Sequence, residues 1–162
     1  MQKNLASSSE TMGAPEPHLD GSGLKIGIVA ARYNWDITGS MLQLARDELL
    51  SLNVLPDNIS VVIVPGAYEL AIAAQSLLRR ERFDALICFG CVMKGETRHD
   101  VVIADAAAQG IQQVALDAHV PIIFGVMCAE SQQQAQARIS RGTECARSAI
   151  EMACTFQALA NS

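Results

Sequence analysis

The segment V-M-K-G-E-T-R-H, residues 92–99, carries the side chains that anion binding and proton transfer would use. Gly95 permits a close backbone turn, and Thr97 offers a hydroxyl where backbone N–H groups can face an anion. His99 follows with an imidazole, the side chain best suited to moving protons near neutral pH. The segment predicts either an anion-binding turn beside a proton carrier or, more simply, a helix cap with a solvated histidine.

Two further segments offer groups that suit a flat, polar ligand. In A-R-Y-N-W, residues 31–35, Tyr33 could stack on a heterocycle, although an aromatic lid over the end of the sheet explains it equally well. In V-P-G-A-Y-E, residues 64–69, Glu69 opens a helix, where a carboxylate is favoured by the helix dipole; it could also accept hydrogen bonds from a polyol. Arg138, further along the chain, is either a phosphate ligand or an ordinary surface charge.

Other chemistries lack their usual patterns. The chain has no G-x-G-x-x-G, Walker A lysine or nucleophile elbow, which argues against dinucleotide redox chemistry, nucleotide hydrolysis and serine-type catalysis. A net charge of −5 and a pI near 5.1 argue against nucleic acid or an anionic membrane as partner. The five cysteines are odd in number and lie mostly in apolar stretches, so we expect reduced thiols and no metal site, even for C-F-G-C at 88–91.

Each chemical segment follows a short apolar run that predicts a buried strand. Strands are predicted at 24–31, 59–64, 85–89 and 120–126, and helices at about 38–52, 68–80, 101–118, 131–138 and 143–159. Apolar strands that alternate with helices indicate a parallel sheet covered on both faces. The predicted fold is a flavodoxin-like three-layer α/β/α sandwich with a four-stranded parallel sheet. The carboxyl ends of its strands share one edge, so the chemical segments should meet there.

The beginning of the chain differs from the rest in composition. Residues 1–22 are polar, rich in Gly and Pro and without periodicity, which predicts a flexible N-terminal arm before one α/β domain at 23–162. The chain has no run of about 18 apolar residues and no secretory-signal pattern. We therefore expect a cytoplasmic protein.

Taken together, the segments resemble the lumazine synthase family. L-K-I-G-I-V-A-A-R-Y-N is similar to the family's first strand and aromatic turn. V-P-G-A-Y-E-L, G-C-V-M-K-G-E-T-R-H and V-P-I-I-F-G-V-M follow in the family's order and spacing, and S-A-I-E-M-A is similar to its last helix. The resemblance covers residues 24–153, nearly the whole predicted domain.

The resemblance implies a role for each segment. Tyr33 would stack on the pyrimidine of 5-amino-6-(D-ribitylamino)uracil, and His99 would be the catalytic residue that transfers protons. Glu96 and Thr97 would form the phosphate-binding turn, with Arg138 as its cation. The ring and ribityl pocket would be lined by Ala67, Tyr68, Glu69 and the backbone of Cys91, Val92 and Met93, and closed by Phe124, in this family often from a neighbouring subunit.

The implied reaction joins that amine to 3,4-dihydroxy-2-butanone 4-phosphate through a Schiff base, loss of phosphate and ring closure with loss of water. The product is 6,7-dimethyl-8-ribityllumazine, an intermediate of riboflavin biosynthesis, and no metal or organic cofactor is needed. Three alternatives stay open: an archaeal-type riboflavin synthase, which dismutates the lumazine; a non-catalytic shell or flavin-binding homologue; and a generic flavodoxin-like phosphate-binding module.

The chain departs from the family pattern at three places. Asp100 follows His99 where the family usually has an aromatic residue, and Ala71 stands where proline is common. The connection around Arg138 and Arg141 is several residues shorter than usual, so Arg141 could share the phosphate-binding role. The resemblance implies a homopentamer at least and leaves two points open: an icosahedral capsid, and an N-terminal arm that adds a strand to a neighbouring subunit.

Overall fold

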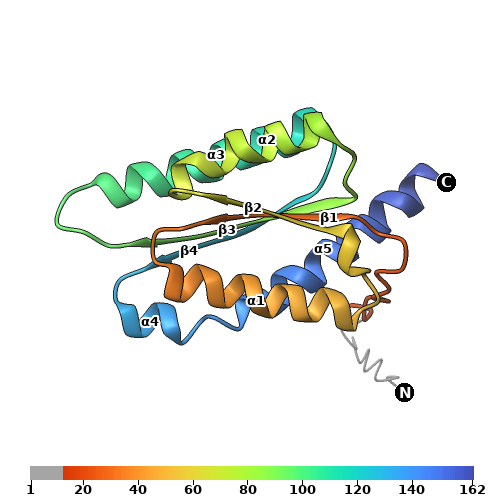
Figure 1. Cartoon of the computed structure of the whole chain (residues 1–162), viewed down its shortest axis with the longest axis horizontal. Coiled ribbons are helices and arrows are strands. Elements are labelled where there is room, and N and C mark those ends of the chain that lie inside the picture. Colours follow the sequence, from red (N-terminus) through yellow and green to blue (C-terminus); the bar gives the residue numbers. More distant parts are fainter. Residues whose placement is uncertain (1–12) are drawn as a thin grey trace, which may run out of the picture.

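A computed structural model describes residues 13–162; residues 1–12 of the predicted arm lie outside the described residues. Figure 1 shows a sheet between two layers of helices. One face is covered by α2 (Leu70–Arg80) and α3 (His99–Ala118). The other is covered by α1 (Trp35–Ser51), the short α4 (Gln132–Gln136) and α5 (Arg141–Ala160). The predicted three-layer α/β/α sandwich is confirmed.

The sheet is parallel throughout, with the strand order β2-β1-β3-β4. Its strands are β1 (Ile26–Ala31), β2 (Ile59–Val64), β3 (Ala85–Met93) and β4 (Ile122–Ala129). All six residues of β1 are buried, because helices cover both faces of this central strand. The predicted flavodoxin-like sheet of four parallel strands is therefore present, with β2 and β4 at its edges.

The third strand is longer than predicted, and the fourth is shifted. β3 was expected to end at Phe89 because glycine and polar loop residues follow, but it continues to Met93. The extension is held by β4: after pairing with β1 stops at Ala30↔Phe89, pairing with β4 continues to Met93↔Ala129. Backbone hydrogen bonding to one neighbour, which side-chain types do not reveal, thus carries β3 past the end of β1 and towards the candidate site.

Besides α5, which begins at Arg141 rather than near residue 143, two helices begin earlier than their sequence patterns predict. α1 begins at Trp35 rather than near residue 38, because the N–H groups of Ile37 and Thr38 already donate to the Asn34 carbonyl at 2.9 and 3.0 Å. α3 begins at His99 rather than near residue 101. Both earlier starts place residues of the chemical segments in the first helical turn.

Aliphatic side chains form a core on each face of the sheet. Ile28, Phe89 and Ile150 belong to the cluster under α1 and α5. Leu70 and Ile111 belong to the cluster under α2 and α3. The two cores fix the strands, so that their carboxyl ends stay together at one edge of the sheet.

The described part of the N-terminal segment joins the domain just before β1. Residues 13–18 are exposed and without regular secondary structure, whereas Leu19 packs against the core. Gly21 is buried, and its N–H donates to the Leu52 carbonyl at 2.6 Å. Within residues 13–162, no helix is long and apolar enough to cross a membrane.

Candidate active site

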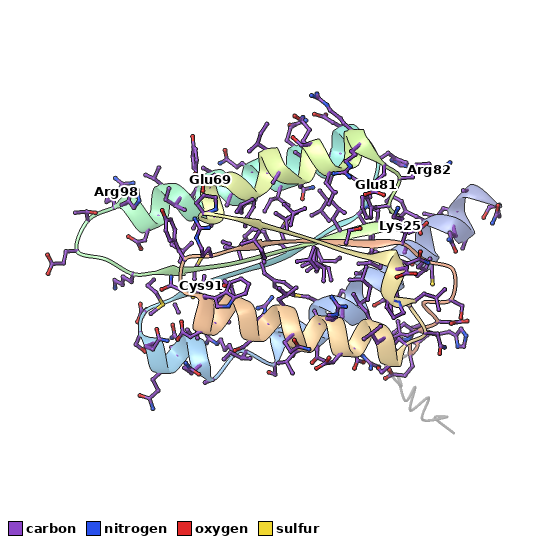
Figure 2. The ribbon with its side chains drawn as sticks, viewed as in Figure 1. Lys25, Glu69, Glu81, Arg82, Cys91 and Arg98 are labelled. Atoms are coloured by element: carbon purple, nitrogen blue, oxygen red, sulfur yellow. The ribbon has the colours of Figure 1, made fainter. Side chains whose placement is uncertain are left out.

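A cavity of about 510 Å³ lies at the carboxyl ends of β1, β2 and β3, beside the start of α3. All three chemical segments, 31–35, 64–69 and 92–99, contribute to its lining. Figure 2 shows Glu69 and Cys91 at this same end of the sheet, with Arg98 at the start of α3. The lining comprises Tyr33, Asn34, Gly66, Ala67, Tyr68, Glu69, Cys91, Val92, Met93, Gly95, Thr97, His99, Asp100 and Ile103.

The turn after β1 presents an aromatic ring to the cavity. The N–H groups of Arg32 and Tyr33 donate to the carbonyls of Val64 and Pro65 at 2.7 and 3.0 Å, which continues the β1–β2 pairing past the strand ends. The Tyr33 ring then covers Gly66, where an added Cβ would lie 2.8 Å from ring carbon Cδ2. Tyr33 is 65% exposed, so one face of its ring is open to a ligand.

Glu69 serves as a cap within this single chain. Its Oε2 accepts a hydrogen bond from the Gly66 N–H at 3.0 Å, which closes the turn before the 3₁₀ helix Ala67–Glu69. This is the capping function that the sequence favoured. The carboxylate is only partly buried and also lines the cavity, so the cap fixes its direction without removing it from the site.

The loop between β3 and α3 leaves its polar groups open to solvent. Thr97 and His99 are exposed, and their one mutual contact is a long hydrogen bond of 3.4 Å from the His99 N–H to Thr97 Oγ1. The helix carries no side-chain cap at Arg98, so most N–H groups of its first turn have no side-chain partner there. Gly95 has no positive φ, and an added Cβ there would meet nothing within 4 Å, so within one chain this turn does not require glycine.

The basic residues of the loop, Lys94 and Arg98, do not line the cavity. Lys94 lies 3.6 Å from Glu130 in an exposed ion pair, which leaves it partly neutralised. Arg138 is exposed and lies after α4, on the other face of the sheet from α3, and does not line the cavity. Arg141, at the start of α5, is also exposed and outside the lining.

Two other predicted site residues also lie outside the cavity of a single chain. Glu96 belongs to the loop before α3 but does not line the cavity. Phe124 projects from the edge strand β4, where it is 38% exposed. The chain therefore brings together nine of the twelve predicted site residues, namely Tyr33, Ala67, Tyr68, Glu69, Cys91, Val92, Met93, Thr97 and His99.

Several lining residues were not predicted from the sequence. Asn34 and Gly66 belong to the chemical segments but were treated as turn residues. Asp100 was noted only as a departure from the family pattern. Ile103 lies one helical turn after His99, a spacing that could have identified it as a neighbour of that side chain.

The cavity thiol is unreactive at neutral pH. Burial raises the pKa of Cys91 to about 11, with smaller contributions from Asp36 and Cys128, so the sulfur stays protonated. Burial likewise raises the pKa of Cys88 to about 12. All five cysteines are free thiols. In the described part of the chain, no three His, Cys, Asp or Glu side chains are grouped as metal ligands would be.

The sequence is similar to known proteins over most of its length. Residues 23–157 match the family described as 6,7-dimethyl-8-ribityllumazine synthase. A protein of that name from Azoarcus sp. (strain BH72) is 39% identical over 145 residues, covering 89% of this chain and 93% of the relative. Another from Acidovorax ebreus (strain TPSY) is 43% identical, covering 87% and 92%. One from Cupriavidus necator is 41% identical, covering 88% and 86%.

These matches confirm the resemblance drawn from the sequence segments, and they cover the residues that surround the cavity. The chain belongs to the 6,7-dimethyl-8-ribityllumazine synthase family.

Proposed function

We propose that this chain is a transferase of riboflavin biosynthesis, which condenses 5-amino-6-(D-ribitylamino)uracil with 3,4-dihydroxy-2-butanone 4-phosphate to 6,7-dimethyl-8-ribityllumazine. One observation carries the proposal beyond family membership. Three of the segments that resemble the family converge on one cavity, which holds an exposed aromatic ring, a fixed carboxylate, a hydroxyl and an imidazole. Such a cavity suits two reactive small molecules, and it needs no cofactor for their condensation.

The pyrimidine substrate would occupy the side of the cavity formed by β1 and β2. Tyr33 offers the open face of its ring for stacking, an arrangement that contributes about 0.5–1.5 kcal/mol beyond area burial for aromatic pairs. Glu69 is oriented by Gly66 and would accept hydrogen bonds from ribityl hydroxyls. The remaining wall would be Ala67, Tyr68 and the backbone of Cys91, Val92 and Met93.

The sugar phosphate would lie at the loop before α3. Glu96 and Thr97 form the turn there, and the first turn of the 20-residue helix α3 adds a favourable dipole for an anion. Among residues 13–162 of a single chain, no Lys or Arg lines the cavity. We therefore assign Arg138 and the closing ring Phe124 to an adjoining subunit, with the cavity completed at the contact between subunits.

His99 would act as the general acid and base. The 5-amino group attacks the ketone of the butanone phosphate and water leaves, which forms the Schiff base. Removal of a proton from the adjacent carbon expels phosphate, and the resulting enol becomes a ketone. The ribityl-bearing nitrogen then attacks that ketone, and loss of a second water closes the ring. Each step moves a proton that an imidazole can carry.

Holding the two substrates side by side would supply much of the acceleration. Correct orientation of two reactants is worth roughly 7–11 kcal/mol, whereas general acid–base help is worth about 10²–10⁴-fold in rate. The cavity lining contains ordinary binding groups and a protonated thiol, which fits a mechanism that depends on positioning.

The family relationship implies an oligomer, and we infer a pentamer at least. Large apolar side chains lie exposed around the cavity rim and on α2, among them Tyr68 at 61% and Ile72 at 62%. Such side chains are favoured in subunit contacts. Native mass spectrometry and light scattering decide between a pentamer and an icosahedral shell. Five free thiols favour a reducing compartment, from which we infer a cytoplasmic location.

The activity is tested by mixing the pure protein with both substrates and following the fluorescence of the lumazine product. We expect product only when both substrates are present. Lumazine alone should give no riboflavin; formation of riboflavin would favour the archaeal-type riboflavin synthase instead. Absence of product with both substrates would contradict the proposal and favour a non-catalytic homologue.

A further inference from the structure

Asn34 adopts an unusual backbone conformation at the edge of the cavity. Its φ of 59° and ψ of 47° lie in the left-handed region, which costs most non-glycine residues free energy and which asparagine tolerates better than others. It precedes α1 directly, at the position where asparagine side chains commonly cap a helix, but its side chain makes no capping hydrogen bond. The Asn34 side chain instead makes a hydrogen bond to another strand.

The Asn34 amide bonds the backbone of β3. Its Nδ2 donates to the Cys91 carbonyl at 2.8 Å. Pairing between β1 and β3 has already ended at Ala30↔Phe89, so this part of β3 has no partner on β1. The side-chain amide thus takes the place of a strand hydrogen bond for a partly buried carbonyl, which would be costly to leave unpaired.

The same turn is tied to β2 by its backbone, through the hydrogen bonds from Arg32 and Tyr33 already described. Two neighbouring strands therefore hold the turn: β2 through backbone N–H groups, and β3 through the Asn34 side chain alone. Tyr33 lies between these two attachments, with its ring on Gly66. Among residues 13–162, the Asn34 amide makes the only hydrogen bond between the turn at residues 32–34 and the end of β3, so it fixes the distance between Tyr33 and that strand end.

We propose that Asn34 is a positioning residue for the pyrimidine substrate. Its amide sets the spacing between the Tyr33 ring and the Cys91–Met93 backbone, the two walls between which the flat ring would lie. This inference rests on the proposed function and adds a residue that acts through Tyr33 rather than by touching the substrate. It predicts that loss of the Asn34 side chain raises KM for the pyrimidine but not KM for the sugar phosphate.

Asn34→Gly tests the role, because glycine accepts positive φ freely and removes only the side chain. We expect KM for the pyrimidine to rise about tenfold, the loss typical of a buried hydrogen bond left unmade, with KM for the butanone phosphate and kcat changed less than about threefold. Asn34→Asp keeps the shape of the side chain but lacks the N–H donors when ionised. It should change the two KM values as Asn34→Gly does, and it replaces that variant in the test if the glycine variant fails to fold.

A matched control exists in Asn53, which also has a positive φ, of 74°, but lies outside the cavity lining. Asn53→Gly makes the same chemical change and should leave both KM values unaltered. An Asn34→Gly variant with an unchanged pyrimidine KM, or with both KM values raised equally, would overturn the proposal.

A double-mutant cycle with Tyr33→Ala tests whether Asn34 acts through the ring. Once Tyr33 is removed, adding Asn34→Gly should reduce kcat/KM for the pyrimidine by less than about threefold. A full tenfold loss in that background would mean that Asn34 acts independently of Tyr33, against the proposal.

Calorimetric titration with the pyrimidine alone separates this inference from the proposed activity. If the wild-type protein binds the pyrimidine but forms no lumazine, the proposed function fails, and the Kd values of the same variants still decide the role of Asn34. A Kd unchanged by Asn34→Gly would overturn it, as would a wild-type protein that binds no pyrimidine.

Discussion

The ring of Tyr33 lies directly on the backbone of Gly66, so closely that an added Cβ at Gly66 would be 2.8 and 2.9 Å from ring carbons Cδ2 and Cε2. The same glycine donates its N–H to Glu69. The stacking surface and the carboxylate are therefore set by one residue between β2 and the following 3₁₀ helix. A small change at Gly66 should consequently alter the positions of both the Tyr33 ring and the Glu69 carboxylate.

Gly66→Ala should weaken pyrimidine binding with little effect on folding. The new methyl must push aside an exposed ring, which can rotate towards solvent, so the melting temperature should change little. Loss of the stacking geometry should raise KM for the pyrimidine by about three- to tenfold. Steady-state kinetics test this, with Gly13→Ala as control, since an added Cβ there meets nothing within 4 Å. An unchanged KM would show that the Tyr33 ring does not contact the substrate.

His99→Ala should lower kcat by about 10²–10⁴-fold, the usual contribution of a general acid or base, and leave both KM values close to those of the wild type. The reason is that the imidazole is exposed at the cavity rim and makes no side-chain hydrogen bond within residues 13–162, so its removal disturbs little else. Single-turnover fluorescence measures the chemical step. A kcat within threefold of wild type would remove His99 from the mechanism.

Arg138→Ala should raise KM for the butanone phosphate and leave KM for the pyrimidine unchanged, because the guanidinium is assigned to the phosphate of a neighbouring subunit's site. A charge-assisted hydrogen bond contributes about 1.5–3 kcal/mol, which corresponds to an increase of roughly ten- to a hundredfold. Arg141→Ala, three residues further along the chain at the start of α5, is the matched control. If only the Arg141 variant raised this KM, the phosphate cation would be Arg141.

Gly142→Ala should destabilise the fold without touching the cavity. α5 crosses α1 at this glycine, where an added Cβ would lie 2.8 Å from the Met41 Cα, and backbone cannot move aside as a side chain can. Overpacking of this kind costs about 1–3 kcal/mol, or roughly 2–4 °C in melting temperature per kcal/mol for a chain of this size. Thermal unfolding at equal protein concentration measures it; an unchanged melting temperature would mean that the two helices pack less closely.

Cys91 should lower the stability of the fold at alkaline pH. Burial raises the pKa of this thiol from 9.0 to about 11, so between these values the unfolded chain has lost a proton that the folded chain retains. The free energy of unfolding should therefore fall as pH rises from 9 to 11, by at most about 1.4 kcal/mol per pKa unit. Cys91→Ala should flatten this decline in urea titrations. Parallel pH profiles for the two proteins would contradict the assignment.

The fold was predictable because each strand is encoded by a short apolar run that can be recognised from its own residues. Four apolar runs separated by amphipathic helices specify a covered parallel sheet, and the second strand was placed correctly at Ile59–Val64. The extension of β3 to Met93 was not predictable, since it depends on pairing with β4, which lies some 30 residues later in the chain. Backbone hydrogen bonds between distant segments do not depend on residue type, so the sequence of the joined residues does not reveal them.

The site was predictable in its composition but not in its geometry. The rule that loops meet at the carboxyl ends of parallel strands brought Tyr33, Glu69 and His99 to one cavity, as predicted. Asn34 was missed because an asparagine before a helix is normally a cap, and only the coordinates reveal that its amide bonds β3 instead. Arg138 and Phe124 lie outside the cavity of one chain, and their proposed roles depend on a second subunit, which the sequence implies only by resemblance.

The most direct test is a crystal structure of the assembled protein with 5-amino-6-(D-ribitylamino)uracil and inorganic phosphate. We predict the pyrimidine ring stacked on Tyr33, its ribityl chain bonded to Glu69, and a phosphate at the turn of Thr97, with His99 between the two. A pyrimidine bound away from Tyr33, or Thr97 and His99 directed away from both ligands in every subunit, would contradict the account.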